Sequence, residues 1–200
     1  MSGGTRAGAM IGGAVTAGAL LSVVGAAPAG SEEAAGEGHH VISAAAIARY
    51  QSASLSAQET GEAYFAAYLK KEWDTVESLL ADHASFRDVT AELLFDSVSH
   101  EGKEAVMTIF REGFARITDM RFHETRTLYS GHYALFEGAL DWTVVIEDGR
   151  APLSMTMAIM TMLKVEDGLV VEHRDFADYT PFIAAERASR ERAEAEEGPP

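Results

Sequence analysis

Hydrophobic positions recur at helical spacing in the first half of the chain's central region and at strand spacing in the second half. Before Asp119 this pattern predicts three helices and one short strand, and a short extra helix across residues 44–50 is compatible with it. The predicted helices span residues 57–71, 73–80 and 103–116, and the short strand spans residues 84–89. The segment between that strand and the third helix is expected to be a loop or an irregular strand.

After Asp119 apolar and polar residues alternate, which is typical of half-buried strands. Four strands are predicted over residues 121–129, 132–146, 153–165 and 169–177. Helices followed by an antiparallel run of strands indicate an α+β fold in which the helices pack on one face of a curved sheet. A sheet folded over helices tends to enclose a pocket, and pockets of this kind bind small molecules.

The two ends of the chain differ in composition from its middle. Residues 1–29 contain an uncharged run rich in Ala and Gly that ends in Ala-Pro-Ala, which is typical of a signal peptide and predicts a secreted or periplasmic protein with no stable membrane anchor after cleavage. A disordered tail and an uncleaved anchor are the alternatives. Residues 30–54 are expected to form a disordered linker, residues 55–183 the folded domain, and residues 184–200 a charged tail with a fraying, solvent-exposed helix.

Charge and residue types exclude several classes of protein. The formal net charge of −15, without blocks of Lys or Arg, argues against a nucleic-acid partner. The absence of cysteine excludes disulfides and thiol catalysis. We expect neither a metal nor a cofactor, because the histidines show no metal-binding spacing and no phosphate-binding glycine motif is present. The histidines of the central region are His83, His100, His123, His132 and His173.

Three acids, Asp88, Asp141 and Asp175, lie on separate predicted strands near the strand ends. An unpaired carboxylate is costly to bury, so each acid either faces solvent or lines a cavity, and their occurrence on three strands favours one shared site. Burial in an apolar pocket raises the pKa of a carboxyl group, which suits proton transfer near neutral pH. His173 is the histidine nearest to this set. Strand alternation leads us to expect that only one of His173 and Asp175 faces a pocket.

One predicted strand is rich in methionine. Its four methionines either pack in the core or give a lipophilic ligand an adaptable lining, since thioether side chains repack easily. They are Met155, Met157, Met160 and Met162.

Three segments together resemble a known family. They are GEAYFAAYLKKEWDTVESLLADHASFRD, HEGKEAVMTIFREGF and KVEDGLVVEHRDFADY. The chain over about residues 57–183 resembles the nuclear-transport-factor-2-like superfamily, and within it the SnoaL-like branch. The resemblance implies a cone-shaped fold in which three N-terminal helices pack on a curved, mainly antiparallel sheet. This fold serves isomerases, cyclases, epoxide hydrolases, dehydratases and non-catalytic binding proteins.

The resemblance also implies roles for individual residues. Tyr64 and Asp88 match the helical tyrosine and the aspartate base of ketosteroid isomerases, although Thr161 stands where those enzymes have a second acid. Asp141 and Asp175 match the two acids of limonene-type epoxide hydrolases, although Ala139 stands where those enzymes have an arginine. SnoaL-like polyketide cyclases act through one aspartate without a cofactor, which implies a role for Asp175 or His173.

Together these observations predict a pocket for a lipophilic small molecule, with acid/base chemistry of the isomerase, cyclase or hydrolase type. Asp88 would be the base, Asp141 and Asp175 a supporting pair, and Tyr64 a hydrogen-bond donor. The alternative is a non-catalytic ligand-binding or dimeric assembly module on the same fold. The resemblance also implies a homodimer through the open face of the sheet, for which Phe136, Leu140 and Trp142 are the candidate interface residues.

Overall fold

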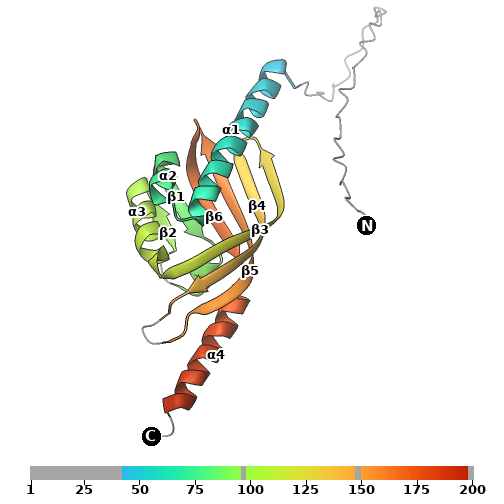
Figure 1. Ribbon diagram of the computed structural model, residues 1–200. Coiled ribbons are helices and arrows are strands. Elements are labelled where there is room, and N and C mark those ends of the chain that lie inside the picture. Colours follow the sequence, from blue (N-terminus) through green and yellow to red (C-terminus); the bar gives the residue numbers. More distant parts are fainter. Residues whose placement is uncertain (1–41, 96–97, 147–149, 198–200) are drawn as a thin grey trace, which may run out of the picture. The chain divides into compact units, whose positions relative to one another are not determined.

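The computed structural model describes residues 42–95, 98–146 and 150–197 (Figure 1). The predicted signal peptide and the first part of the predicted linker lie outside these residues. In chain order, the helices are α1 (Ala44–Leu69), α2 (Trp73–Leu79), α3 (Lys103–Thr108) and α4 (Thr180–Glu197). The strands are β1 (Leu80–Asp88), β2 (Ser99–Glu101), β3 (Ile117–Ser130), β4 (Tyr133–Val144), β5 (Leu153–Glu166) and β6 (Leu169–Ala177). Short 3-10 or π turns occupy Ala91–Leu93, Ile109–Gly113 and Phe114–Arg116.

The strands form one sheet in the order β2-β1-β6-β5-β4-β3. Every neighbouring pair is antiparallel except β1 and β6, which run parallel. The four long strands predicted from the alternating pattern are therefore confirmed, and β1 and β2 extend the sheet beyond β6. The α+β fold is confirmed as well.

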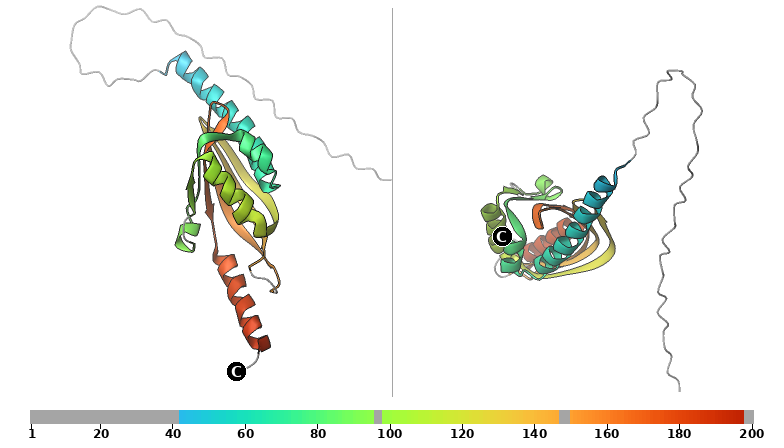
Figure 2. Two further views of the ribbon diagram at one scale, coloured as in Figure 1. Left: turned by 90° about the vertical axis from the view of Figure 1, so that its left-hand side faces the viewer. Right: turned by 90° about the horizontal axis from the view of Figure 1, so that it is seen from above.

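The sheet curves around the helices on its concave face (Figure 2). Part of this curvature has a local cause, because the register between β3 and β4 shifts between Glu124 and Arg126, opposite Gly138. A Cβ atom at Gly138 would lie 2.2 Å from the carbonyl oxygen of His123, so a larger residue cannot occupy this position. A bulge beside a glycine is a common way to bend a strand pair.

The hydrophobic core lies between α1 and the concave face. Phe65 of α1 stacks on Phe136 of β4 with ring centroids 4.3 Å apart. At Gly61 the helix comes so close to β4 that a Cβ atom would lie 2.7 Å from the Cβ of Ala134. Buried aromatic side chains such as Phe65 and Phe136 contribute much of the stability of a small core.

Helix α1 begins at Ala44, earlier than the predicted start at residue 57, so the prediction of a disordered linker is wrong for residues 44–54. Ser43 caps the helix by accepting a hydrogen bond from the backbone N–H of Ala46 at 3.1 Å. The early turns are also held by the β3–β4 turn, where the Ser54 hydroxyl accepts from the Gly131 N–H at 2.8 Å. The sequence pattern allowed only a separate short helix over residues 44–50, because residues 44–56 are mostly exposed and lack an apolar stripe.

Helix α4 follows directly after β6 and extends the fold beyond the sheet (Figure 1). Its first turn packs against the sheet through Phe182, whose ring lies 5.6 Å from that of Trp142. The rest of the helix carries the charged residues of the predicted C-terminal tail. Within the described ranges, no helix combines the length and apolar character needed to cross a membrane.

Candidate functional site

Strands β1 and β6 bring the candidate residues together. Their parallel register pairs Phe86 with His173 and Asp88 with Asp175. Residues two apart on a strand share a face, so all four side chains point to the concave side of the sheet. Neighbouring strands therefore bring together Asp88 and Asp175, two of the three acids for which one shared site was predicted.

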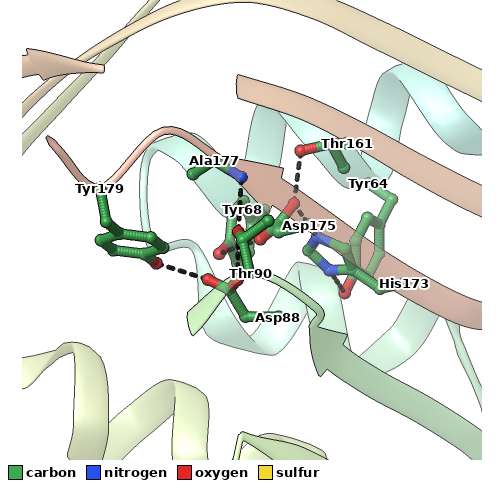
Figure 3. Close-up of polar contacts among 9 residues, drawn as sticks. All are labelled: Tyr64, Tyr68, Asp88, Thr90, Thr161, His173, Asp175, Ala177 and Tyr179. Carbon is green, nitrogen blue, oxygen red and sulfur yellow. Dashed lines mark hydrogen bonds and ion pairs between the residues drawn. The ribbon is translucent and has the colours of Figure 1, made fainter. Parts of the chain in front are cut away.

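A buried network surrounds Asp175 (Figure 3). One carboxylate oxygen, Oδ1, accepts from the Thr161 hydroxyl at 2.6 Å and lies 3.1 Å from His173 Nε2, while Oδ2 accepts from the Tyr68 hydroxyl at 3.5 Å. The other ring nitrogen of His173, Nδ1, lies 3.1 Å from the Tyr64 hydroxyl. A carboxylate only accepts hydrogen bonds, so this arrangement assigns the proton to Nε2 and makes Tyr64 the donor to Nδ1.

Asp175 lines the cavity described below, whereas the fully buried His173 lies behind it. Only one of the two therefore reaches the cavity, as expected, but the reason given by strand alternation is wrong. The two residues are two positions apart, so they share a face and differ in depth. Tyr64, fully buried as well, holds His173 and is not a lining residue.

Asp88 is held by a separate set of donors (Figure 3). Its Oδ1 accepts from the Ala91 N–H at 2.9 Å and from the Thr90 hydroxyl at 3.1 Å, and its Oδ2 accepts from the Tyr179 hydroxyl at 2.5 Å. Burial raises the pKa of Asp88 above its ordinary value of 3.8, and the charge of Asp175 acts in the same direction. The three hydrogen bonds oppose this shift, because they stabilise the ionised form.

The tyrosine hydroxyls of the site stay protonated. Burial, and after it the charge of nearby carboxyl groups, raises the pKa of Tyr64, Tyr68 and Tyr179 above the ordinary value of 10.0. Each hydroxyl is therefore a hydrogen-bond donor throughout the physiological pH range.

The two acids face a cavity of about 380 Å³ inside the cone. Most of its wall is apolar, and its polar side chains gather at the β1–β6 side. The carboxyl and hydroxyl groups of the lining belong to Tyr68, Asp88, Thr161, Asp175 and Tyr179. The apolar lining includes Phe65, Phe86, Phe122, Leu140, Trp142 and Met157. A cavity of this size suits a small molecule with a lipophilic body.

Asp141 is not part of this site, and its prediction as a member of the acid pair is wrong. It lies on the outer face of β4, where Oδ2 lies 2.7 Å from His123 Nε2 and Oδ1 accepts from the Thr156 hydroxyl at 2.7 Å. The proximity of His123 lowers the pKa of Asp141. The residue before it, Leu140, and the residue after it, Trp142, point inward instead.

The residues predicted for the dimer interface are wrong as well, because they point to the inner face of the sheet. Phe136 is buried under α1, and Leu140 and Trp142 line the cavity, so none of them is on the open face of the sheet.

Of the four methionines, Met157 is a lining residue and nearly fully buried, while Met160 and Met162 alternate to the outer face. No group of three or more metal-binding side chains occurs within the residues that the structure describes.

Sequence reasoning did not single out Tyr68 and Tyr179 as site residues, and it considered Thr161 only as the position where an isomerase has its second acid. A signal for Tyr68 existed, since it lies one helical turn after Tyr64 and so shares its face. Tyr179 follows the last strand, where only the fold shows that its hydroxyl reaches back to Asp88.

A sequence profile of the SnoaL-like domain matches residues 62–173, which is more than half of the 200 residues. The chain belongs to the SnoaL-like domain family. A search of curated proteins finds no match to this SnoaL-like protein.

Solved structures place the SnoaL-like protein among cone-shaped relatives. A candidate SnoaL-like polyketide cyclase from Shewanella denitrificans is 15% identical, covering 66% of this chain and 96% of that one, with a TM-score of 0.58. An LEH-like epoxide hydrolase from M. tuberculosis is 22% identical, covering 66% and 91%, with a TM-score of 0.53. A Catenulispora acidiphila protein with a ketosteroid isomerase-like fold, in complex with trimethylamine, is 16% identical, covering 64% and 91%, with a TM-score of 0.52. These likenesses establish the fold.

Proposed function

We propose that this SnoaL-like protein is a cofactor-free acid/base enzyme that moves a proton on a lipophilic small molecule. One observation carries the proposal: Asp88 and Asp175 are paired in register on neighbouring strands, and both line an otherwise largely apolar cavity. A carboxyl group in an apolar site has its pKa raised, which suits it to take a proton from a bound molecule near neutral pH.

Asp88 is the proposed base. Among the residues that the structure describes, its Oδ1 has two donors, whereas Oδ2 has only the Tyr179 hydroxyl and keeps one lone pair for a substrate proton. The raised pKa of Asp88 makes its carboxylate a stronger base than an exposed aspartate. Asp175 is arranged in the same way, with two partners on Oδ1 and one long hydrogen bond on Oδ2.

The reaction class that fits is proton removal next to a carbonyl group. Asp88 would take a proton from carbon, the electron pair would move towards the carbonyl oxygen, and the proton would return to the same or another atom. With no other bond change this sequence is an isomerisation. In a ring closure the enolate carbon would instead bond to a second carbonyl carbon of the same molecule, and the oxygen of that second carbonyl would take the electron pair of its C=O bond and the proton. The hydrolase alternative is disfavoured because Asp141 is on the outer face, so its pairing with Asp175 is absent from the cavity.

Deuterium exchange tests the proposal without knowledge of the natural substrate. The full chain would be incubated in D2O with 2-tetralone, a bicyclic ketone, and deuterium entry beside the carbonyl followed by mass spectrometry. We expect acceleration by the wild type and a loss of about 10²-fold to 10⁴-fold for Asp88→Asn, since a positioned base contributes that much. Asp141→Asn is the matched control, and it should retain the wild-type rate because its carboxylate lies outside the cavity.

A non-catalytic ligand-binding module is the second candidate. It is favoured by Thr161, which stands where an isomerase has its second acid and here donates to Asp175. Binding of 2-tetralone without accelerated exchange in the wild type would support this candidate and refute the enzyme.

Export is proposed separately, on the composition of residues 1–29. Expression in a bacterial host, followed by mass analysis of the periplasmic and culture fractions, should give a product shortened to about residue 30. Uncleaved protein in the membrane fraction would refute cleavage.

A further inference from the structure

His100 lies on β2, one strand away from the proposed base. The antiparallel register pairs it with Phe86, so its imidazole points to the same concave face as Phe86 and Asp88. The two rings are nearly parallel, at 17°, with centroids 6.4 Å apart. His100 is accordingly a lining residue of the cavity.

The imidazole of His100 has an unused hydrogen-bonding atom. Its Nε2 is buried and makes no hydrogen bond within the described part of the chain. Burying a polar nitrogen without a partner costs stability, so such an atom calls for an explanation.

The other polar groups of the cavity do not share this property. The hydroxyls of Tyr68 and Thr161 are directed at Asp175, and the hydroxyl of Tyr179 is directed at Asp88. These donors hold the two carboxylates in place. None of them is free to hold the carbonyl oxygen of a ketone unless it releases its carboxylate.

His100 also has space around it. Together with Ile109 it separates the cavity from a second hollow, whose wall includes Glu101 and Glu104. Because the imidazole lines both hollows, rotation of its side chain would bring the unpaired nitrogen to a ligand in the cavity.

We infer that His100 binds the carbonyl oxygen of a lipophilic ketone held in the cavity. Along β1, Asp88 lies two residues beyond Phe86, about 7 Å further along the strand and on the same face. A ketone whose oxygen is held at His100 can therefore present the neighbouring carbon to Asp88. The inference rests on the proposed function and adds the substrate's polar group and the residue that recognises it.

The test compares two ligands with the same carbon frame, 2-tetralone and tetralin, which differ by the carbonyl group. Dissociation constants would be measured for the full-length wild type, His100→Phe and His123→Phe. The readout is tryptophan fluorescence, since Trp142 lines the cavity. His123 is a matched control because its ring is on the outer face, against Asp141.

We expect His100→Phe to weaken 2-tetralone relative to tetralin by about fivefold to tenfold, the usual value of one hydrogen bond. His123→Phe should leave the ratio of the two constants unchanged. In ¹⁵N spectra of the wild type, 2-tetralone should shift the Nε2 signal of His100 while tetralin should not. This second measurement decides the matter if His100→Phe does not fold.

The outcomes separate this inference from the function on which it rests. If both ligands bind, but the ratio is unchanged in His100→Phe or the ¹⁵N signal does not respond to the ketone, the assignment of His100 is refuted and the lipophilic cavity stands. If neither ligand binds the wild type, the inference fails together with the proposed ketone chemistry.

Discussion

Asp88 shows at the scale of one residue how burial and hydrogen bonding compete. Burial raises its pKa above the ordinary 3.8 despite three donors. The folded protein therefore holds the proton of the Asp88 carboxyl more tightly than the unfolded chain does. As a result, Asp88 lowers the free energy of unfolding as pH rises from about 3.9 to the raised pKa, and its contribution stays constant at higher pH.

This competition predicts an opposite pH dependence for two Asn variants. Relative to wild type, Asp88→Asn should gain free energy of unfolding as pH rises from 4 to 7, by about 1.4 kcal/mol for each unit by which the pKa is raised. Asp141→Asn should lose relative stability as pH rises from acid to neutral, because His123 lowers the pKa of Asp141 and its stabilising effect disappears in acid. Urea unfolding at each pH measures both. Parallel curves for wild type and Asp88→Asn would contradict the raised pKa.

Two tyrosines one helical turn apart should differ in what their hydroxyls do. Tyr64→Phe removes the donor to the buried His173 Nδ1, so we expect a loss of about 1–3 kcal/mol in stability. Tyr68→Phe removes only a 3.5 Å contact to Asp175 in the cavity wall, so it should cost less stability and instead change deuterium exchange. Urea unfolding and the exchange rate of each variant separate the two roles. Equal losses of stability would show that the Tyr68 contact is as strong as that of Tyr64.

The first turn of α4 is important at the scale of elements, because it closes one end of the sheet with aromatic rings. Phe182 lies 5.6 Å from Trp142, 5.9 Å from Phe95 and 6.4 Å from Tyr179, measured between ring centroids. Phe182→Ala should therefore cost about 2 kcal/mol in free energy of unfolding. The neighbouring Ile183 is 40% exposed, and Ile183→Ala should change stability by less than about 0.5 kcal/mol. Similar effects of both substitutions would show that α4 does not dock through Phe182.

The sequence could predict those helices and strands in which the spacing of apolar residues indicates the buried face. Strand β6 was predicted at its observed bounds because residues 169–177 alternate and are bounded by turns. The continuity of α1 from Ala44 into the helix predicted from residue 57 was missed because hydrogen bonds to a distant turn, such as Gly131 N–H to Ser54, leave no local pattern.

The site follows the same division. Asp88 and Asp175 could be proposed because acids on apolar strands are conspicuous. The sequence could not predict that Asp141 lies outside the site, because the alternation of apolar and polar residues does not say which face of a strand is the inner one. The donors from Tyr68 and Tyr179 depend on contacts between residues about 90 to 110 positions apart in the chain.

The outer face of the sheet is the relevant surface at the scale of the whole molecule. Apolar side chains alternate onto this face from three adjacent strands, and cross-strand register brings Leu135 beside Met162 and Met160 beside Phe176. Charged residues also occupy the face, among them the paired Arg126 and Glu137. Apolar residues flanked by charges are typical of an interface between copies of a protein.

We therefore propose that the homodimer forms through this outer face, in place of the inward-pointing residues predicted from sequence. Sedimentation equilibrium should give about twice the 21.4 kDa chain mass for uncleaved protein. Met160→Lys should shift the equilibrium to monomer, because it introduces a charge into the apolar strip. Leu93→Lys is the control, since Leu93 is 91% exposed on a turn outside the sheet. A monomeric wild type, or equal effects of the two lysines, would refute a dimer at this face. Because Met160 and the lining residue Thr161 are adjacent on β5, a dimer here would also stiffen the strand that holds Asp175 through Thr161.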